Sequence, residues 1–183
     1  ANRSVRLAVL SPRECAADIW RHLNELNKHH ATTLKQDKAF LPEYIGFQDV
    51  FRCGLNIPNG NDTKRFKGYS LSDALKASAE EFFNGICRYI DVMEREKHEF
   101  DVLVIYIPNR LSKMRELKNE NVYFDLHDSL KIYCAGKGIV TQIIEERSVH
   151  TNSDMAKIMW GLSTAIYTKA VGKLWKPKMT RYD

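Results

Sequence analysis

The apolar and polar positions of this chain form short apolar runs that alternate with longer stretches of helical spacing. Two runs, Val5–Leu10 and Asp101–Ile107, have the length and largely continuous apolar character of strands buried on both faces. A shorter run, Ile139–Ile144, predicts another strand. Phe47–Ile57 is rich in residues that favour strands and predicts a fourth, although polar residues interrupt it.

The stretches between these runs place apolar residues three and four apart, which is typical of amphipathic helices. Four helices are predicted: one from Pro12 to about Lys28, where Ser11–Glu14 resembles a capping box; one from Ser72 as cap to about Lys97; one from Asp125 as cap to Ala135, ended by Gly136 or Gly138; and one from Asn152 or Ser153 as cap to about Trp175. Residues 58–67 and 111–121 are predicted to be loops, the second with room for a short helix.

Strands that alternate with helices predict an α/β fold with a parallel sheet flanked by helices. Such sheets bind ligands beyond the carboxyl ends of their strands. We therefore expect Pro108–Arg110, the start of the helix capped by Asp125, and Gln142 to lie at or just after strand ends.

Composition narrows the class of protein. The chain has 183 residues, of which 44% are hydrophobic and 28% charged, as expected for one soluble globular domain. It has no apolar run long enough to span a membrane, and Leu7–Leu10 is too short for a secretory signal. The four cysteines have no metal-binding spacing, so we predict free thiols in a reducing, cytoplasmic setting.

The net charge of +5 is unevenly placed, because residues 101–183 hold 13 Lys and Arg against 9 Asp and Glu. This excess is compatible with contact to a phosphate backbone, and equally with a basic surface helix. The segment Lys64–Lys67 is basic and aromatic, but a solvated loop accounts for it better. His29 and His30 have no cysteine or carboxylate at metal-binding spacing, so a surface loop is the simpler interpretation.

The strongest candidate chemistry lies between residues 125 and 142. His127 and Lys131 are four apart and share one face of the predicted helix. Unpaired N–H groups and the helix dipole make a helix start favourable for an anion. Gln142 would add a neutral donor, so together these residues suggest a pocket for a terminal phosphate. A His/Lys pair on a solvated helix surface is the plain alternative.

These residues, taken with Gly138–Gln142 and a later helix carrying Lys169, resemble the MID domain of prokaryotic Argonaute proteins, in particular the histidine–lysine subgroup. The opening segments, including Leu41–Phe47, fit the same pattern. The similarity covers most of the chain and is strongest from Asp101 to Trp175.

The resemblance implies a Rossmann-like fold that anchors the 5′-phosphorylated end of a short DNA or RNA guide. It implies phosphate binding by His127, Lys131, Gln142 and Lys169, with Lys173, Thr141, Asn121, Tyr123 and Asp125 as accessory residues. The first guide base would stack near His127. Relatives often carry a further lysine one helical turn before the position of Lys169, where this chain has Ala165. The resemblance also implies that a Mg²⁺ ion can bind at the guide 5′ end.

On this interpretation the chain is a single MID-like domain, 1–183. Residues 1–100 form its amino-terminal strand and helix part, 101–175 its phosphate-binding half, and 176–183 a tail toward a PIWI domain. That PIWI domain, in the same or a partner chain, would carry any nuclease activity, so we expect a binding domain and not an enzyme. The sequence leaves the guide type and the preferred first base open.

Two other functions remain open. One is a structural, partner-binding domain whose phosphate pocket is degenerate. The alanine at position 165, where relatives often carry lysine, is compatible with this function. The other is a nucleotide-dependent α/β enzyme. The second is disfavoured because no GxGxxG or GxxxxGK[ST] motif follows a strand.

Overall fold

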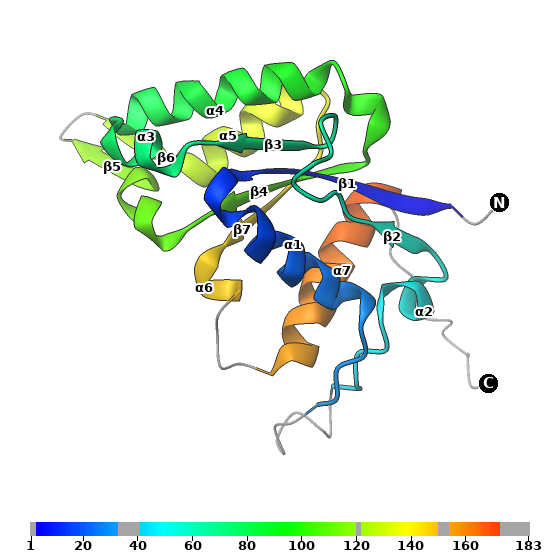
Figure 1. Cartoon of the computed structure of the whole chain (residues 1–183). Coiled ribbons are helices and arrows are strands. Elements are labelled where there is room, and N and C mark those ends of the chain that lie inside the picture. Colours follow the sequence, from blue (N-terminus) through cyan, green and yellow to red (C-terminus); the bar gives the residue numbers. More distant parts are fainter. Residues whose placement is uncertain (1–2, 33–40, 120–121, 150–153, 173–183) are drawn as a thin grey trace, which may run out of the picture.

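The computed structural model describes residues 3–32, 41–119, 122–149 and 154–172. It shows a parallel sheet with helices on both faces, which confirms the predicted Rossmann-like α/β fold (Figure 1). The strands are β1 (Ser4–Pro12), β2 (Gly54–Asn56), β3 (Phe66–Tyr69), β4 (Val102–Ile107), β5 (Glu116–Asn119), β6 (Val122–Asp125) and β7 (Thr141–Glu145). The α-helices are α1 (Ala16–Asn24), α2 (Phe47–Phe51), α3 (Leu71–Lys76), α4 (Ala79–Glu94), α5 (Leu126–Gly136), α6 (Glu146–Val149) and α7 (Met155–Val171), and short 3₁₀ turns lie at Arg13–Cys15, Glu25–Asn27, Lys97–Glu99 and Asn109–Met114.

The sheet has the order β2-β1-β4-β7, and β3 also pairs with β1. β2 pairs with Ser4–Arg6 and β3 with Val9–Pro12, so these two strands follow one another along the same edge of β1. β4 pairs with the other edge of β1, and β7 pairs with β4 at the end of the order. β5 and β6 form a separate antiparallel hairpin just before α5.

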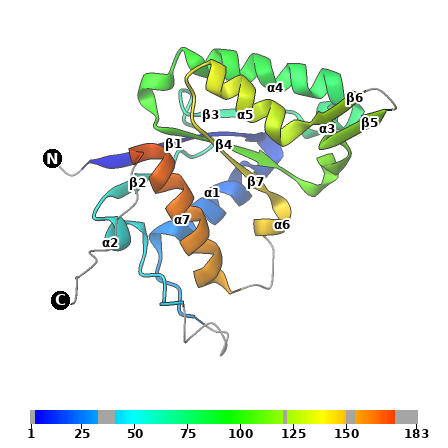
Figure 2. The same ribbon diagram turned by 180° about the vertical axis from the view of Figure 1, so that it is seen from behind.

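β4 lies at the centre of the fold, and all six of its residues are buried. Its side chains alternate between two cores, one shared with α4 and α5 and the other with α1 and α7. Figure 2 shows the same two layers from behind, with α7 crossing below the sheet and α5 above it. Burial on both faces explains why the sequence of β4 is continuously apolar.

The helix α5 begins and ends as predicted. The Asp125 carboxylate accepts a hydrogen bond from the Asp128 backbone N–H at 2.8 Å, as expected of an N-cap. Gly138 follows the helix with a φ of 70°, a left-handed conformation that glycine adopts without steric cost. α1 and its 3₁₀ extension also match the predicted first helix, ending at Asn27.

The strand predicted over Phe47–Ile57 is mostly wrong. Phe47–Phe51 form the helix α2, and only Gly54–Asn56 form a strand. The rings of Phe47 and Phe51, one helical turn apart, lie 4.7 Å from each other, and the Phe51 ring stacks on Tyr167 at 4.3 Å. This packing on one side of the turn outweighs the strand propensity of the residues.

Two capping predictions are also wrong. Ser72 lies inside α3, and the predicted long helix is two helices, capped by Ser70 and by Ser78, the second with a complete capping box formed with Glu81. Ser11 stays in β1, where its hydroxyl donates to the Pro12 carbonyl. The pattern located helix starts in general but could not choose among neighbouring serines.

Two predicted loops contain strands. Residues 66–69 form β3, and residues 116–119 pair with 122–125 as the β5–β6 hairpin. The charges before β3 are paired, Lys64 with Glu99 at 2.7 Å and Arg65 with Asp62 at 3.0 Å, so they form no exposed basic cluster.

Three other predictions concern the last helix, the cysteines and the membrane. The proposed caps Asn152 and Ser153 lie outside the described residues, and Asp154 caps α7 by accepting from the Ala156 N–H. All four cysteines are free thiols, as predicted. Within the described part of the chain no helix has the length and apolar character needed to cross a membrane.

Candidate functional site

The first part of the candidate site lies on α5. His127 is in the first turn and Lys131 in the next, so the two side chains share one face of the helix. The His127 Nδ1 lies 3.6 Å from the Asp128 carboxylate, and its side chain is 45% exposed. Lys131 is exposed.

The second part joins β7 to α7. The Lys169 Nζ donates to the Gln142 Oε1 at 2.6 Å and to the Thr141 carbonyl at 2.8 Å. The amide nitrogen of Gln142 in turn donates to the carbonyl of Ile143 at 3.3 Å. Two side chains far apart in the sequence, Gln142 and Lys169, are therefore in direct contact, with Thr141 beside them.

The electrostatic state of Lys169 links the two parts. Burial lowers the pKa of its ammonium group below the usual 10.5, and the positive charge of Lys131 lowers that pKa further. Lys131 lies on α5 and Lys169 on α7, on opposite faces of the sheet, and the charge of Lys131 acts unfavourably on that of Lys169. An anion placed there would relieve this repulsion.

The hydrogen bonds of Lys169 and Gln142 follow from the position of β7. In the parallel pairing of β4 with β7, Leu103 lies opposite Thr141, and its N–H donates to the carbonyl of Val140. In this register the backbone groups of Thr141 and Ile143 point away from β4. The carbonyls of Thr141 and Ile143, which accept hydrogen bonds from Lys169 and Gln142, are among these outward-facing groups. The two side chains therefore also provide hydrogen-bond donors to carbonyls at the outer edge of the sheet.

Gln142 does not lie where the sequence predicted. It is the second residue of β7, at the amino end of the strand, and not at its carboxyl end. The prediction failed because Ile139 and Val140, although apolar, precede the strand. α5 has 11 residues, about 16 Å at 1.5 Å per residue, and leads back from the β6 end toward the start of β7 (Figure 2).

The remaining predicted residues take different places. Asp125 is the N-cap of α5, Thr141 is buried, and Tyr123 on β6 is 64% exposed. Asn121 and Lys173 lie outside the described residues. The structure thus brings Gln142, Lys169 and Thr141 into contact, and the charge of Lys131 acts on Lys169. His127 instead lies beside its neighbour Asp128.

A cavity that sequence reasoning missed lies beside this contact, between β7 and α7. Its volume is about 410 Å³. Its walls are mostly apolar, with polar groups from Gln142 and from two residues of α1 and α7; the lining residues are His22, Gln142, Ile143, Ile144, Lys157, Ile158, Gly161, Leu162 and Ala165. Small residues at i and i+4 on α7, Gly161 and Ala165, were the available signal in the sequence.

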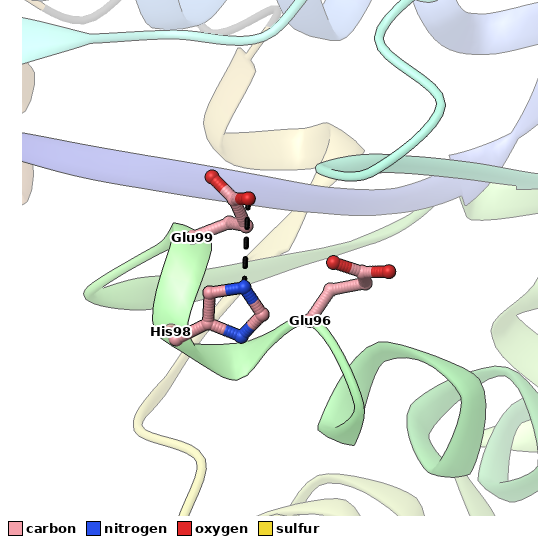
Figure 3. A group of neighbouring side chains, drawn as sticks. All are labelled: Glu96, His98 and Glu99. Atoms are coloured by element: carbon pink, nitrogen blue, oxygen red, sulfur yellow. Dashed lines mark ion pairs between the residues drawn. The ribbon is translucent and has the colours of Figure 1, made fainter.

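Two groups in the described part of the chain bring three potential metal ligands together. Asp125, His127 and Asp128, at the start of α5, offer ligand atoms within 4.8 Å of one another. Glu96, His98 and Glu99 form the other group, with the His98 ring beside the Glu99 carboxylate (Figure 3). Glu99 is already paired with Lys64, which makes the second group the weaker candidate for a cation.

Comparisons with known proteins add no further identification. No protein-family model and no curated protein matches this chain. The functional interpretation therefore depends on the residues and their geometry.

Proposed function

We propose that this chain binds the 5′-phosphorylated end of a short guide strand of DNA or RNA, in the manner of the MID domain of a prokaryotic Argonaute. The observation that carries the proposal is the contact between Lys169 and Gln142, with the charge of Lys131 acting on it. The resemblance to the MID domain implies that each of these three residues binds the phosphate.

The charge balance supports an anion as the ligand. Lys131 and Lys169 repel each other, and within the described residues neither is joined to a carboxylate by an ion pair. A terminal phosphate carries close to two negative charges at neutral pH, which matches two ammonium groups. Lysines on opposite faces of a sheet edge can grip such a group from two sides.

The hydrogen-bonding capacity also fits. An ammonium group has three donors, and Lys169 uses two of them for Gln142 and Thr141. One donor of Lys169, the donors of Lys131 and the second N–H of the Gln142 amide remain for phosphate oxygens. Charge-assisted hydrogen bonds of this kind contribute roughly 1.5–3 kcal/mol each.

The Asp125, His127 and Asp128 group at the start of α5 suits a divalent cation. The two carboxylates supply the oxygen ligands that Mg²⁺ prefers, although one oxygen of Asp125 already caps α5. When bound, such an ion would neutralise guide phosphates near the helix start.

In this proposal the protein partner is a PIWI domain, in the same or a partner chain, which would supply any cleavage of nucleic acid in the cytoplasm.

A paired binding titration tests the proposal. Oligonucleotides that differ only in a 5′ phosphate or a 5′ hydroxyl are titrated by fluorescence anisotropy, as DNA and as RNA. We expect the phosphorylated strands to bind more tightly, and less so as salt is raised. Equal affinity of the two strands would reject the proposal.

A matched pair of variants locates the site. Lys131→Ala should remove most of the preference for the 5′ phosphate. Lys76→Ala, which removes an exposed lysine from the end of α3, should leave the preference unchanged. An unchanged preference in Lys131→Ala would show that the phosphate binds elsewhere.

A structural, partner-binding role is the second candidate, and one observation favours it. Lys169 and Gln142 satisfy the outer carbonyls of β7, a role that requires no ligand. Exposed apolar side chains, Ile132 at 73% and Val140 at 43%, lie on α5 and just before β7. Absence of oligonucleotide binding, with retained folding, would favour this function.

A further inference from the structure

The cavity between β7 and α7 shares the side chain of Gln142 with the proposed phosphate site. Gln142 lines the cavity and also accepts from Lys169. Ala165 lies one helical turn before Lys169, so the cavity wall continues the face of α7 that carries the ammonium group. The proposed phosphate site and the cavity therefore adjoin along one face of α7, within reach of different parts of one nucleotide.

The size and lining of the cavity fit a nucleoside. Its volume of about 410 Å³ lies in the range of small-molecule pockets, roughly 300–1,000 Å³. Ile158 and Leu162 of α7 and Ile144 of β7 line the cavity, and their apolar side chains can contact a flat ring. Gly161 and Ala165 leave the space open, because larger side chains at these positions would fill it.

We infer that the cavity between β7 and α7 holds the base of the terminal nucleotide whose 5′ phosphate binds at Lys131, Gln142 and Lys169. The inference rests on the proposed function and extends it to the terminal base. It places the base on the α7 side of the sheet. Stacking on His127, which the Argonaute resemblance implies, would place the base on the α5 side, and the two positions exclude each other.

The test compares four 5′ ends on one oligonucleotide: a phosphate or a hydroxyl, each followed by a normal nucleotide or by an abasic tetrahydrofuran. For the wild-type protein, we expect removal of the first base from the phosphorylated strand to weaken binding about tenfold, which corresponds to about 1.4 kcal/mol. Affinities are measured by fluorescence anisotropy at a fixed salt concentration.

The variants fill the cavity or remove the alternative platform. Ala165→Leu should abolish the difference between the normal and abasic strands and keep the preference for the 5′ phosphate. Gly161→Leu should do the same, and serves if Ala165→Leu fails to fold, since an added Cβ at position 161 meets no atom within 4 Å. Ala17→Leu, on the exposed side of α1, adds the same atoms elsewhere and should leave both differences unchanged.

Two results overturn the inference while leaving the proposed function intact. One is equal binding of normal and abasic phosphorylated strands by the wild-type protein. The other is a base contribution that survives both filling variants and disappears in His127→Ala. A wild-type protein that binds the 5′-phosphate and 5′-hydroxyl strands equally is a separate result, which overturns the proposed function and this inference with it.

Discussion

Two lysines beside α5 have opposite surroundings. Lys137, at the end of the helix, lies 3.2 Å from Asp91 and 3.5 Å from Glu94, and its ammonium group sits 5.5 Å from the centre of the Tyr133 ring. Lys169, which reaches β7 from α7 on the other face of the sheet, donates to the neutral oxygens of Thr141 and Gln142 and forms no ion pair among the described residues.

The pKa values record this difference. The hydrogen bond and charge of Asp91 raise the pKa of Lys137, whereas burial and the charge of Lys131 lower the pKa of Lys169. The first lysine is neutralised by the protein itself, and the second belongs to a site with surplus positive charge. A positive surface charge is thus informative about ligands only after its partners within the fold have been counted.

The largest expected effect is on phosphate binding. Lys169→Met should weaken binding of a 5′-phosphorylated oligonucleotide by roughly 10- to 150-fold, the equivalent of one charge-assisted hydrogen bond to a charged group. Lys137→Met, the matched variant at the neutralised lysine, should change it by less than about twofold. Anisotropy titrations measure both, and a similar loss in the two variants would show that the two lysines do not differ in their availability to an anion.

The second effect is on the pH dependence of binding. Because the pKa of Lys169 is lowered, its proton is lost below the usual 10.5, and affinity for the 5′ phosphate should fall as pH rises through that lowered pKa. Stability should move the other way, since folding no longer has to hold a desolvated charge. Lys169→Arg keeps the charge at these pH values, so its affinity should stay flat.

The acidic side of the neutralised cluster behaves differently. Hydrogen bonds from Tyr133 and Lys137 lower the pKa of Asp91 below its usual 3.8. Its stabilising contribution is therefore present above that value and is lost as pH falls through the lowered pKa. Denaturant titrations at acid and alkaline pH would separate the two clusters, and a common pH profile would show that they are coupled.

A third effect concerns the helix that carries Lys131. Asp125→Ala removes the N-cap of α5 and should lower the free energy of unfolding by about 1 kcal/mol. Asp128→Ala keeps the backbone N–H that the cap binds and removes an exposed carboxylate, so it should cost less. Urea denaturation measures both, and an equal cost would mean that the cap contributes little.

The smallest expected effect is on thermal stability. Lys137→Met should lower Tm because it leaves Asp91 and Glu94 with less neutralisation. Lys131→Met removes a charge that repels Lys169 and should leave Tm unchanged or slightly higher. A fall in both variants would indicate that Lys131 has a stabilising partner in solution.

The sequence predicted the parts of the fold that are determined by local pattern. β1 and β4 were predicted because strands buried on both faces are apolar at most positions. α5 was predicted because Asp125 and Gly138 mark its two ends chemically. The same local features pointed to Lys131 and Gln142 as candidates.

The parts that failed depend on contacts distant in the sequence. Phe47–Phe51 form a helix because Tyr167 packs against Phe51, and no local pattern reports that contact. Gln142 was placed at the wrong end of β7 because the register with β4 decides where that strand begins. The cavity beside Lys169 depends on what faces Ala165, which becomes visible only once β7 and α7 are packed together.

The long strand β1 has a consequence for how the chain folds. One edge of β1 pairs with β2 and β3 in succession, and the other pairs with β4, where Leu7 is the partner of Val102. The long loop between these partners must close, at a cost in chain entropy, before the stabilising strand pairing can form. This order predicts a slow, nonlocal folding step. During synthesis, an amino-terminal part that ends before Val102 would keep one edge of its longest apolar strand unpaired, so this nascent intermediate should be the species most prone to aggregate.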